Sequence, residues 1–249
     1  MKLSLCNELL AADGLSLAQQ CEAARELGYM GLELALGSFH EQPHKMSDGE
    51  IADIRRIVED HSLVVTGLHW LLAPYPETSI IQPDKAPETK AILFRLVEIC
   101  ALLGGRVLVH GSPAQRQTFE DEGFEQTQER LAAFFSPIAA ASQAAGVTYC
   151  IEPLSHAETS VINTVSEGVA LVELINAPAF RTMIDTSAAG QAESEPVAEL
   201  LRRWLPTGKV VHVQVNDTNR GAPGMGDDPF VEIAAALHDC DWQHPVAVE

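Results

Sequence analysis

The chain has 249 residues, 46% of them hydrophobic, and carries 35 acidic against 16 basic residues, which gives a formal net charge of −19. The hydrophobic content is enough to bury a substantial core, which excludes a disordered chain, and no apolar run is long enough to span a membrane. Nucleic acid is excluded as a partner because phosphate binding needs clustered Lys and Arg, and this sequence has no such cluster.

The distribution of cysteines and linkers indicates one cytoplasmic domain. The five cysteines lie far apart and form no Cys-x-x-Cys pair, which is typical of reduced, buried thiols. The first ten residues carry Lys2 and Glu8 and no small-residue cleavage site, which predicts a first strand and no signal peptide. No Gly/Ser/Pro-rich linker divides the sequence, so we expect a single domain over residues 1–249.

Hydrophobic periodicity predicts strands and helices in strict alternation along the chain. The expected strands are 3–10, 29–36, 63–72, 106–110, 147–152, 181–185, 209–215 and 245–249. The expected helices are 16–27, 47–58, 87–103, 125–145, 166–175, 197–204 and 230–238. Glycines at 28, 104 and 146 end three of these helices. The prediction is therefore eight strands with seven intervening helices.

This alternation predicts an α/β fold with a parallel sheet, and eight strands close into a (β/α)8 TIM barrel. An open doubly wound sheet is the alternative, but the first strand is not followed by the Gly-rich turn typical of that fold. The sequence ends directly after the eighth strand without an eighth helix. We therefore expect either a shortened chain or a barrel in which the terminal carboxylate of Glu249 lies beside the site.

Three expected strands end in a carboxylate after an apolar run, at Glu152, Asp185 and Glu249. In a TIM barrel the C-terminal ends of the strands form the active site, so these three side chains converge on one mouth. Buried carboxylates this close repel one another unless a partner compensates them, and a divalent cation is the simplest common partner. The alternative is that each is exposed to solvent or paired with an arginine.

The polar sequence of the last four strands resembles a known family. Glu-Pro-Leu-Ser-His-Ala-Glu occupies 152–158, and His-Val-Gln-Val-Asn-Asp-Thr-Asn-Arg-Gly-Ala-Pro-Gly-Met-Gly occupies 212–226. With Asp185 and Glu249, these segments resemble the xylose isomerase-like TIM barrel superfamily. Within it they resemble the sugar isomerase/epimerase group, which contains ketose 3-epimerases and hydroxypyruvate isomerase. The resemblance in architecture covers the whole chain, and the specific motifs lie between residues 147 and 249.

The resemblance implies a metal site. Ketose 3-epimerases hold their metal with Glu, Asp, His and Glu, and the first, second and fourth positions fall on Glu152, Asp185 and Glu249. The third falls on Gln214, a residue type that resembles hydroxypyruvate isomerase, and His212 is the weaker candidate. Carboxylate and amide oxygens favour Mg²⁺ or Mn²⁺ over Zn²⁺.

Five further residues are expected to bind substrate. The resemblance implies this role for Glu158 and Arg220. His69, Trp70 and His110 follow the third and fourth strands, where Trp70 can stack on a sugar and the histidines can bind its hydroxyls. Each has an alternative role. Glu158 could be a solvated loop residue, Arg220 could form a surface ion pair, and His69 and His110 could be structural.

Three departures from the family pattern affect the prediction. Ala188 stands where the epimerases carry a substrate-binding histidine, and Ser155-His156 replaces their Asn-Arg pair. Asp227-Asp228-Pro229 stands where the DNA-repair branch carries Asp-x-His. The first two changes remove side chains expected to bind the substrate. The third disfavours a function in DNA repair.

Together these features predict an enzyme of the isomerase class. We expect a metal-dependent sugar isomerase or 3-epimerase, with Glu152 and Glu249 moving a proton α to a carbonyl through a metal-stabilised enediolate. The substrate would be a small keto sugar or hydroxy-keto acid. A lyase or dehydratase acting on a keto sugar or keto-inositol, and a non-catalytic sugar-binding barrel, are the alternatives. We expect no nucleic-acid or membrane partner and leave a homo-oligomer open.

Overall fold

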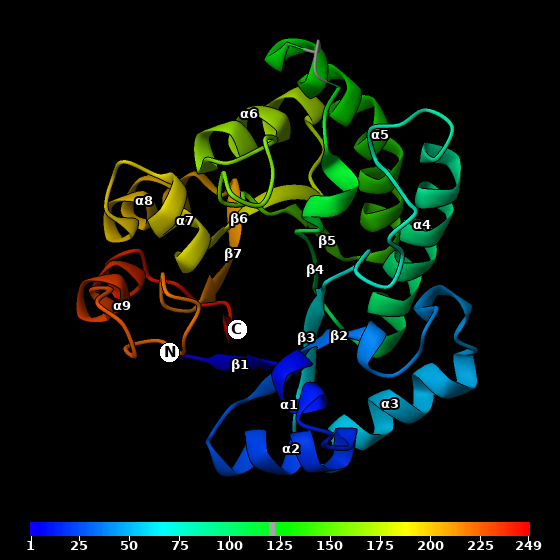
Figure 1. Ribbon diagram of the computed structural model, residues 1–249. Coiled ribbons are helices and arrows are strands. Elements are labelled where there is room, and N and C mark those ends of the chain that lie inside the picture. Colours follow the sequence, from blue (N-terminus) through cyan, green and yellow to red (C-terminus); the bar gives the residue numbers. More distant parts are fainter. Residues whose placement is uncertain (120–122) are drawn as a thin grey trace.

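The computed structural model describes residues 1–119 and 123–249, and its strands form a closed parallel barrel in sequence order (Figure 1). The strands are β1 (Leu3–Cys6), β2 (Gly31–Ala35), β3 (Val64–His69), β4 (Val107–His110), β5 (Thr148–Ile151), β6 (Phe180–Asp185), β7 (Val210–Val215) and β8 (Val246–Val248). β8 closes the barrel by pairing with β1, with Leu3 opposite Val246. The predicted (β/α)8 barrel is thus confirmed.

Helices surround the barrel on its outer side (Figure 1). The α-helices are α1 (Glu8–Ala12), α2 (Leu17–Glu26), α3 (Asp48–Asp60), α4 (Ala86–Leu103), α5 (Phe124–Ala145), α6 (Val165–Ile175), α7 (Thr186–Ala192), α8 (Val197–Trp204) and α9 (Phe230–Asp239). Short 3₁₀ segments among the described residues are η1 (Leu36–Ser38), η2 (Pro43–Lys45), η3 (Pro113–Arg116) and η4 (Leu205–Thr207). No helix in the described residues has the length and apolar character needed to cross a bilayer.

Local signals explain where several helices begin and end. Ser16, Ser47 and Thr164 form capping boxes at the starts of α2, α3 and α6, each satisfying two backbone donors. Gly104 and Gly146 adopt left-handed conformations after α4 and α5, with φ of 83° and 72°. Residues other than glycine are disfavoured there, so the expected helix ends match the structure.

Two short helices were not expected from the sequence. The first is α1, where the prediction of a strand over 3–10 was wrong beyond Cys6. The side chain of Asn7 makes hydrogen bonds that direct the chain away from the sheet at this point. Its Nδ2 donates to Gln20 Oε1 at 3.1 Å and its Oδ1 accepts from the Ala35 backbone N–H at 2.7 Å. The second, α7, follows β6 directly because Asp185 caps it, accepting from the Ala188 N–H at 2.7 Å.

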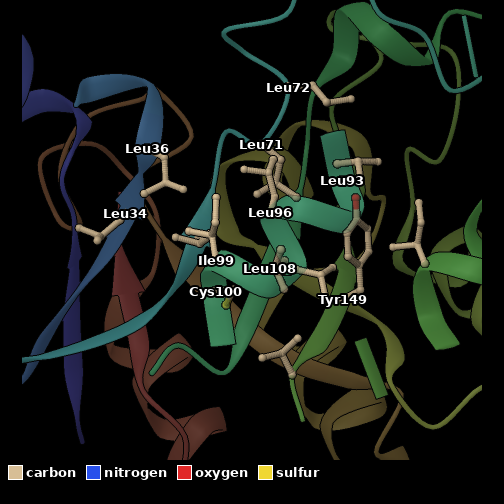
Figure 2. Close-up of a cluster of buried hydrophobic side chains, with 14 of the residues drawn as sticks. Leu34, Leu36, Leu71, Leu72, Leu93, Leu96, Ile99, Cys100, Leu108 and Tyr149 are labelled. Carbon is tan, nitrogen blue, oxygen red and sulfur yellow. The ribbon is translucent and has the colours of Figure 1, made fainter. Parts of the chain in front are cut away.

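The core lies between the barrel strands and the helix layer. Figure 2 shows part of it, where side chains of β2, β4 and β5 pack with those of α4. Leu34, Leu93, Leu108 and Tyr149 are fully buried there. Burial of each such side chain contributes about 1.5–3 kcal/mol, so this layer gives the strand ends a rigid support.

Candidate active site

Three carboxylates meet at the C-terminal mouth of the barrel, and we call them the acidic triad. Glu152 follows β5, Asp185 ends β6 and Glu249 follows β8. Each offers one oxygen atom, and these oxygens all lie within 4.8 Å of one another. Glu152 and Asp185 are buried and Glu249 is partly buried. The structure therefore brings together the three carboxylates singled out by the sequence.

Burial and mutual repulsion disfavour the charged form of the acidic triad. Burial raises the pKa of Glu152 well above its usual range, and the charges of Glu249 and Asp185 raise it further. Burial and the charge of Glu249 raise the pKa of Asp185 to about 8. The pKa of Glu249 is also raised, chiefly by burial. A positive charge placed among the three oxygens would reverse this preference.

One oxygen of the acidic triad has no partner, and a glycine lies against another. Asp185 Oδ1 accepts from the Ala188 N–H, but its buried Oδ2 has no hydrogen-bond partner among the described residues. Glycine at position 111 is required for the placement of Glu152, because a Cβ there would lie 2.4 Å from Glu152 Oε2. The glycine after His110 therefore lets the carboxylate pass close to the backbone.

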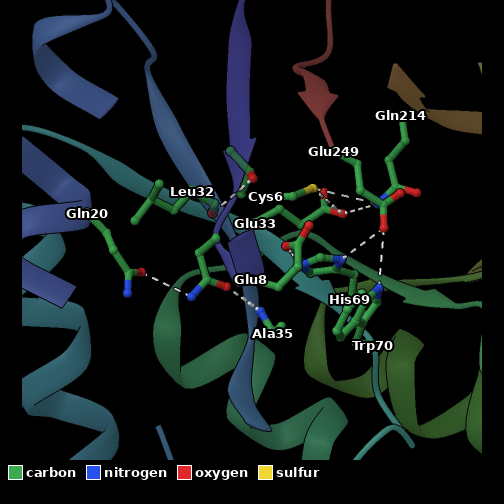
Figure 3. Close-up of polar contacts among 12 residues, drawn as sticks. Cys6, Glu8, Gln20, Leu32, Glu33, Ala35, His69, Trp70, Gln214 and Glu249 are labelled. Atoms are coloured by element: carbon green, nitrogen blue, oxygen red, sulfur yellow. Dashed lines mark hydrogen bonds and ion pairs between the residues drawn. The ribbon is translucent and has the colours of Figure 1, made fainter. Parts of the chain in front are cut away.

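Gln214 lies opposite Asp185 in the ladder between β6 and β7. Its Nε2 donates to Glu33 Oε1 at 2.7 Å (Figure 3), so the amide oxygen is the atom left for another partner. His212, the weaker ligand candidate, has its Nε2 2.9 Å from Glu33 Oε2. Both side chains are thus held by one glutamate inside the barrel.

Glu33 was not among the predicted site residues. It is fully buried in β2, where burial raises its pKa, but His212, His69 and Gln214 together outweigh burial and the pKa is lowered. Glu33 is therefore ionised. A signal was available in the sequence, because Glu33 interrupts an apolar strand and a buried charge requires partners.

His69 and Trp70 both contact the acidic triad through Glu249. His69 Nε2 lies 3.1 Å from Glu8 Oε2 and its Nδ1 lies 3.9 Å from Glu249 Oε1. Burial lowers the pKa of His69, but Glu8, Glu33 and Glu249 together outweigh burial and bring the pKa to about 9. Trp70 Nε1 donates to Glu249 Oε1 at 3.3 Å (Figure 3). Glu8 was missed from the sequence because it was assigned to a strand.

Glu158 and Arg220 form an ion pair between the loops that follow β5 and β7. Glu158 Oε1 lies 2.7 Å from Arg220 Nη2, and Glu158 Oε2 accepts from the Ser155 N–H and hydroxyl at 3.1 and 2.7 Å. Burial raises the pKa of Glu158, but Ser155 and Arg220 outweigh it and the pKa is lowered. Arg220 has a φ of 67°, a strained conformation that often marks functional loops.

His110 is placed differently from the other predicted substrate residues. It is fully buried, its Nδ1 lies 2.6 Å from Tyr149 Oη, and its ring packs edge-on against Phe135. Burial, with the charge of Arg116, lowers the pKa of His110 to about 3, so the ring is neutral. These contacts belong to the hydrophobic layer, and contact of His110 with substrate stays a prediction.

Arg116 is a buried cation that the sequence prediction missed. Its side chain is fully buried and Nη1 donates to the Glu152 backbone carbonyl at 2.8 Å. Its Nε and Nη2 have no hydrogen-bond partner among the described residues. The charge of Glu152 acts to keep this guanidinium protonated, although burial lowers its pKa to about 10. Arg116 thus supports the backbone at the first residue of the acidic triad.

Comparisons with known proteins agree with this arrangement. The sequence profile described as "Xylose isomerase-like TIM barrel" matches residues 21–249. D-psicose 3-epimerases of Ruminiclostridium cellulolyticum and Agrobacterium fabrum are 26% and 25% identical to this chain. Each alignment covers 92% of this chain, and 76% and 77% of the respective relative.

Solved structures show the same fold. A crystal structure of D-psicose 3-epimerase in the presence of D-fructose superposes with a TM-score of 0.82 at 23% identity. The superposition covers 100% of this chain and 84% of the other. Since the family profile matches nearly the whole chain, this protein belongs to the xylose isomerase-like TIM barrel family and to its sugar isomerase and epimerase enzymes.

Proposed function

We propose that this enzyme is a metal-dependent ketose 3-epimerase or isomerase that moves a proton α to the carbonyl of a small keto sugar. The observation that carries the proposal is the acidic triad, with three carboxylate oxygens within 4.8 Å at the barrel mouth. The D-psicose 3-epimerases that align with nine-tenths of the chain favour a ketose as the substrate.

The residues at the triad fit a divalent cation with a preference for oxygen. Glu152, Asp185 and Glu249 would supply carboxylate oxygens, and Gln214 would supply the amide oxygen that its bond to Glu33 leaves free. The buried, unpartnered Oδ2 of Asp185 supports this assignment. An all-oxygen set favours Mg²⁺ or Mn²⁺. When bound, such a cation would polarise the substrate carbonyl and stabilise negative charge that develops beside it.

Proton transfer is assigned to Glu152 and Glu249. They follow β5 and β8, which are separated by two strands around the barrel, so they can approach a bound sugar from opposite faces. A carboxylate held beside the α carbon takes the proton as a general base and, once protonated, returns a proton as a general acid. If one takes the α proton and the other returns a proton to the same carbon from the opposite face, the product is the epimer. Return to the neighbouring carbon would give the isomer.

The remaining polar groups at the mouth would hold the sugar. Arg220 and Glu158 offer donors and acceptors for hydroxyl groups from one side, and half of the Arg220 side chain is exposed. Trp70 offers an exposed ring on the side of β3. Because Ala188 replaces the histidine of the related epimerases, the hydroxyl that the histidine would bind must find another partner.

Hydrogen exchange tests the proposal directly. Purified protein with Mn²⁺ or Mg²⁺ is incubated with a panel of ketoses in D₂O, and the sugars are analysed by NMR and mass spectrometry. We expect deuterium at the carbon α to the carbonyl together with the 3-epimer or the isomer. Glu152→Gln, which preserves shape but cannot accept the proton, is expected to abolish exchange.

The same experiment separates the alternatives. Loss of water with a new enone absorbance would instead indicate a dehydratase. Sugar binding by the wild type and by Glu152→Gln, without hydrogen exchange in either, would indicate a non-catalytic barrel. Absence of exchange with every ketose tested would contradict the proposal.

A further inference from the structure

A second group of metal-ligating side chains lies beside the acidic triad and shares no residue with it. Cys6 ends β1, Glu8 begins α1 and His69 ends β3. Each offers one donor atom, and these three atoms all lie within 4.8 Å of one another. The three side chains lie close together in Figure 3, and we call them the Cys–Glu–His cluster.

The cluster is buried, and its polar atoms lack hydrogen-bond partners. The exposed fractions of Cys6, Glu8 and His69 are 3%, 7% and 2%. Glu8 Oε2 and both ring nitrogens of His69 have no hydrogen-bond partner among the described residues. Buried polar atoms without such partners are rare in folded proteins. An ion held between these side chains is a partner that all three could share.

The spacing within the cluster fits ligands of one ion. Glu8 Oε2 and His69 Nε2 face each other at 3.1 Å. Two ligands of a tetrahedral zinc ion lie about 3.3 Å apart, because Zn–N and Zn–O bonds are about 2.0–2.1 Å long. Cys6 Sγ lies 3.9 Å from both Glu33 Oε1 and Gln214 Nε2. These are weak sulfur contacts that a bond to a metal can replace.

The surroundings of Cys6 carry a surplus of negative charge. Burial raises the pKa of its thiol well above the usual range, and three nearby carboxylates raise it further. These are the side chains of Glu33, Glu249 and Glu8. In the part of the chain that the structure describes, their ion-pair partners are histidines, with no Lys or Arg among them. A divalent ion would supply two positive charges where a protonated imidazole supplies one.

The donor types select the ion. Thiolate sulfur and imidazole nitrogen favour Zn²⁺, whereas the oxygens of the acidic triad favour Mg²⁺ or Mn²⁺. Three protein ligands leave a fourth position for water. Glu8 also lines a cavity of about 530 Å³, which offers the ion and its water a route to the cluster.

We propose that the Cys–Glu–His cluster is a zinc site, distinct from the metal site of the acidic triad. The zinc ion would join the end of β1 to the end of β3, two strands that both pair with β2. Binding would release the protons of the Cys6 thiol and of the His69 ring. This site goes beyond the proposed reaction and does not depend on turnover.

Cobalt spectroscopy tests the site, because Co²⁺ bound to a thiolate shows a sulfur-to-metal charge-transfer band in the near ultraviolet. The protein is stripped of metal under reducing conditions and titrated with Co²⁺. Asp185→Asn serves as the background, since it lacks one carboxylate of the acidic triad. We expect the band in the wild type and in Asp185→Asn, and its loss when Zn²⁺ displaces Co²⁺. Adding Cys6→Ser should abolish the band, whereas the control Cys240→Ser should keep it.

Zinc content gives a second readout. After dialysis against dilute Zn²⁺, elemental mass spectrometry should find about one zinc ion per chain in Asp185→Asn and about none once Cys6→Ser is added. Glu8→Gln keeps the thiol, and it should weaken Co²⁺ binding about tenfold or more, so the test also stands if Cys6→Ser does not fold.

Three results would overturn the zinc site. They are absence of the thiolate band in the wild type, a band that persists in Cys6→Ser, and wild-type Co²⁺ affinity in Glu8→Gln. These readouts need no turnover, so the zinc site and the proposed reaction can fail independently. Deuterium exchange into a ketose tests the reaction, and the thiolate band tests the cluster.

Discussion

Gln214 Nε2 donates a hydrogen bond to Glu33 Oε1 at 2.7 Å, although β7 and β2 are not neighbours in the barrel. This hydrogen bond crosses the barrel interior and fixes the orientation of the Gln214 amide, so that the amide oxygen faces away from Glu33. His212 contacts the other oxygen of the same carboxylate at 2.9 Å. Glu33 is therefore a positioning residue, because its effect on the proposed metal site runs through Gln214.

Replacing Glu33 with Gln should weaken metal binding. The neutral side chain can no longer hold the Gln214 amide in one orientation, and loss of such a supporting partner typically costs about 10- to 100-fold in metal affinity. Titration of Mn²⁺ followed by electron paramagnetic resonance measures the dissociation constant without reference to activity. Glu22→Gln, an exposed change on α2, is the control. Wild-type Mn²⁺ affinity in a folded Glu33→Gln protein would contradict the role of Glu33.

The pH dependence of stability in EDTA should reveal the raised pKa of Asp185, which burial and the charge of Glu249 cause. The pKa of Asp185 is raised to about 8 in the folded protein, above its value in the unfolded chain of about 3.9. The folded state thus binds more protons between these values. The stabilisation is fully present below about pH 4 and is lost as the pH rises through 8.

Asp185→Asn isolates this contribution, because the amide does not titrate. In EDTA, the free energy of unfolding of the wild type should rise relative to that of the variant as the pH falls from 8 to 4. Chemical denaturation at several pH values measures both proteins. A difference that is independent of pH would show that the pKa of Asp185 is not raised in the folded protein.

Metal should stabilise the wild type but not Asp185→Asn at neutral pH. A ligand that binds only the folded state stabilises it by about 2.7 kcal/mol at 100 times its dissociation constant. Wild-type protein should therefore melt several degrees higher with Mn²⁺ than with EDTA, whereas Asp185→Asn should not respond. Differential scanning calorimetry gives both values, and an equal response of the two proteins would remove Asp185 from the ligand set.

The sequence was sufficient to predict the barrel and the acidic triad because both follow from local patterns. Strand and helix periodicities repeat along the chain, and Glu152, Asp185 and Glu249 each end an apolar run. The ends of parallel strands in a closed barrel necessarily meet at one mouth. The Glu158–Arg220 contact was not predicted as a pair, because it depends on how two loops turn.

Partners across the barrel could not be derived in the same way. Glu33 meets Gln214 only after eight strands have closed with a particular stagger, and nothing near Glu33 in the sequence specifies that partner. Glu8 was hidden by the continuation of an apolar run, which the side chain of Asn7 interrupts through contacts with Gln20 and Ala35. Such contacts depend on tertiary structure, which overrides local pattern.

The Glu158–Arg220 pair should affect substrate affinity more than stability. Arg220 is about half exposed, so solvent screening limits the pair to about 1 kcal/mol or less of folding free energy. Arg220→Ala should raise KM for a ketose about tenfold with a melting temperature close to that of the wild type. Arg220→Lys should recover part of the loss because it keeps a donor and the charge. A large fall in melting temperature with unchanged KM would assign the pair a structural role instead.

Tyr149→Phe should distinguish a structural His110 from a substrate-binding one. The change removes the hydroxyl that lies 2.6 Å from His110 Nδ1 and leaves a fully buried imidazole nitrogen without that partner. The expected cost is about 1–3 kcal/mol of unfolding free energy, measured by denaturant titration, with kcat and KM for a ketose within about threefold of the wild type. Because Phe fills the same space against Phe135 and Phe180, no cavity complicates the comparison. A rise in KM without loss of stability would instead mean that Tyr149 orients His110 toward the sugar.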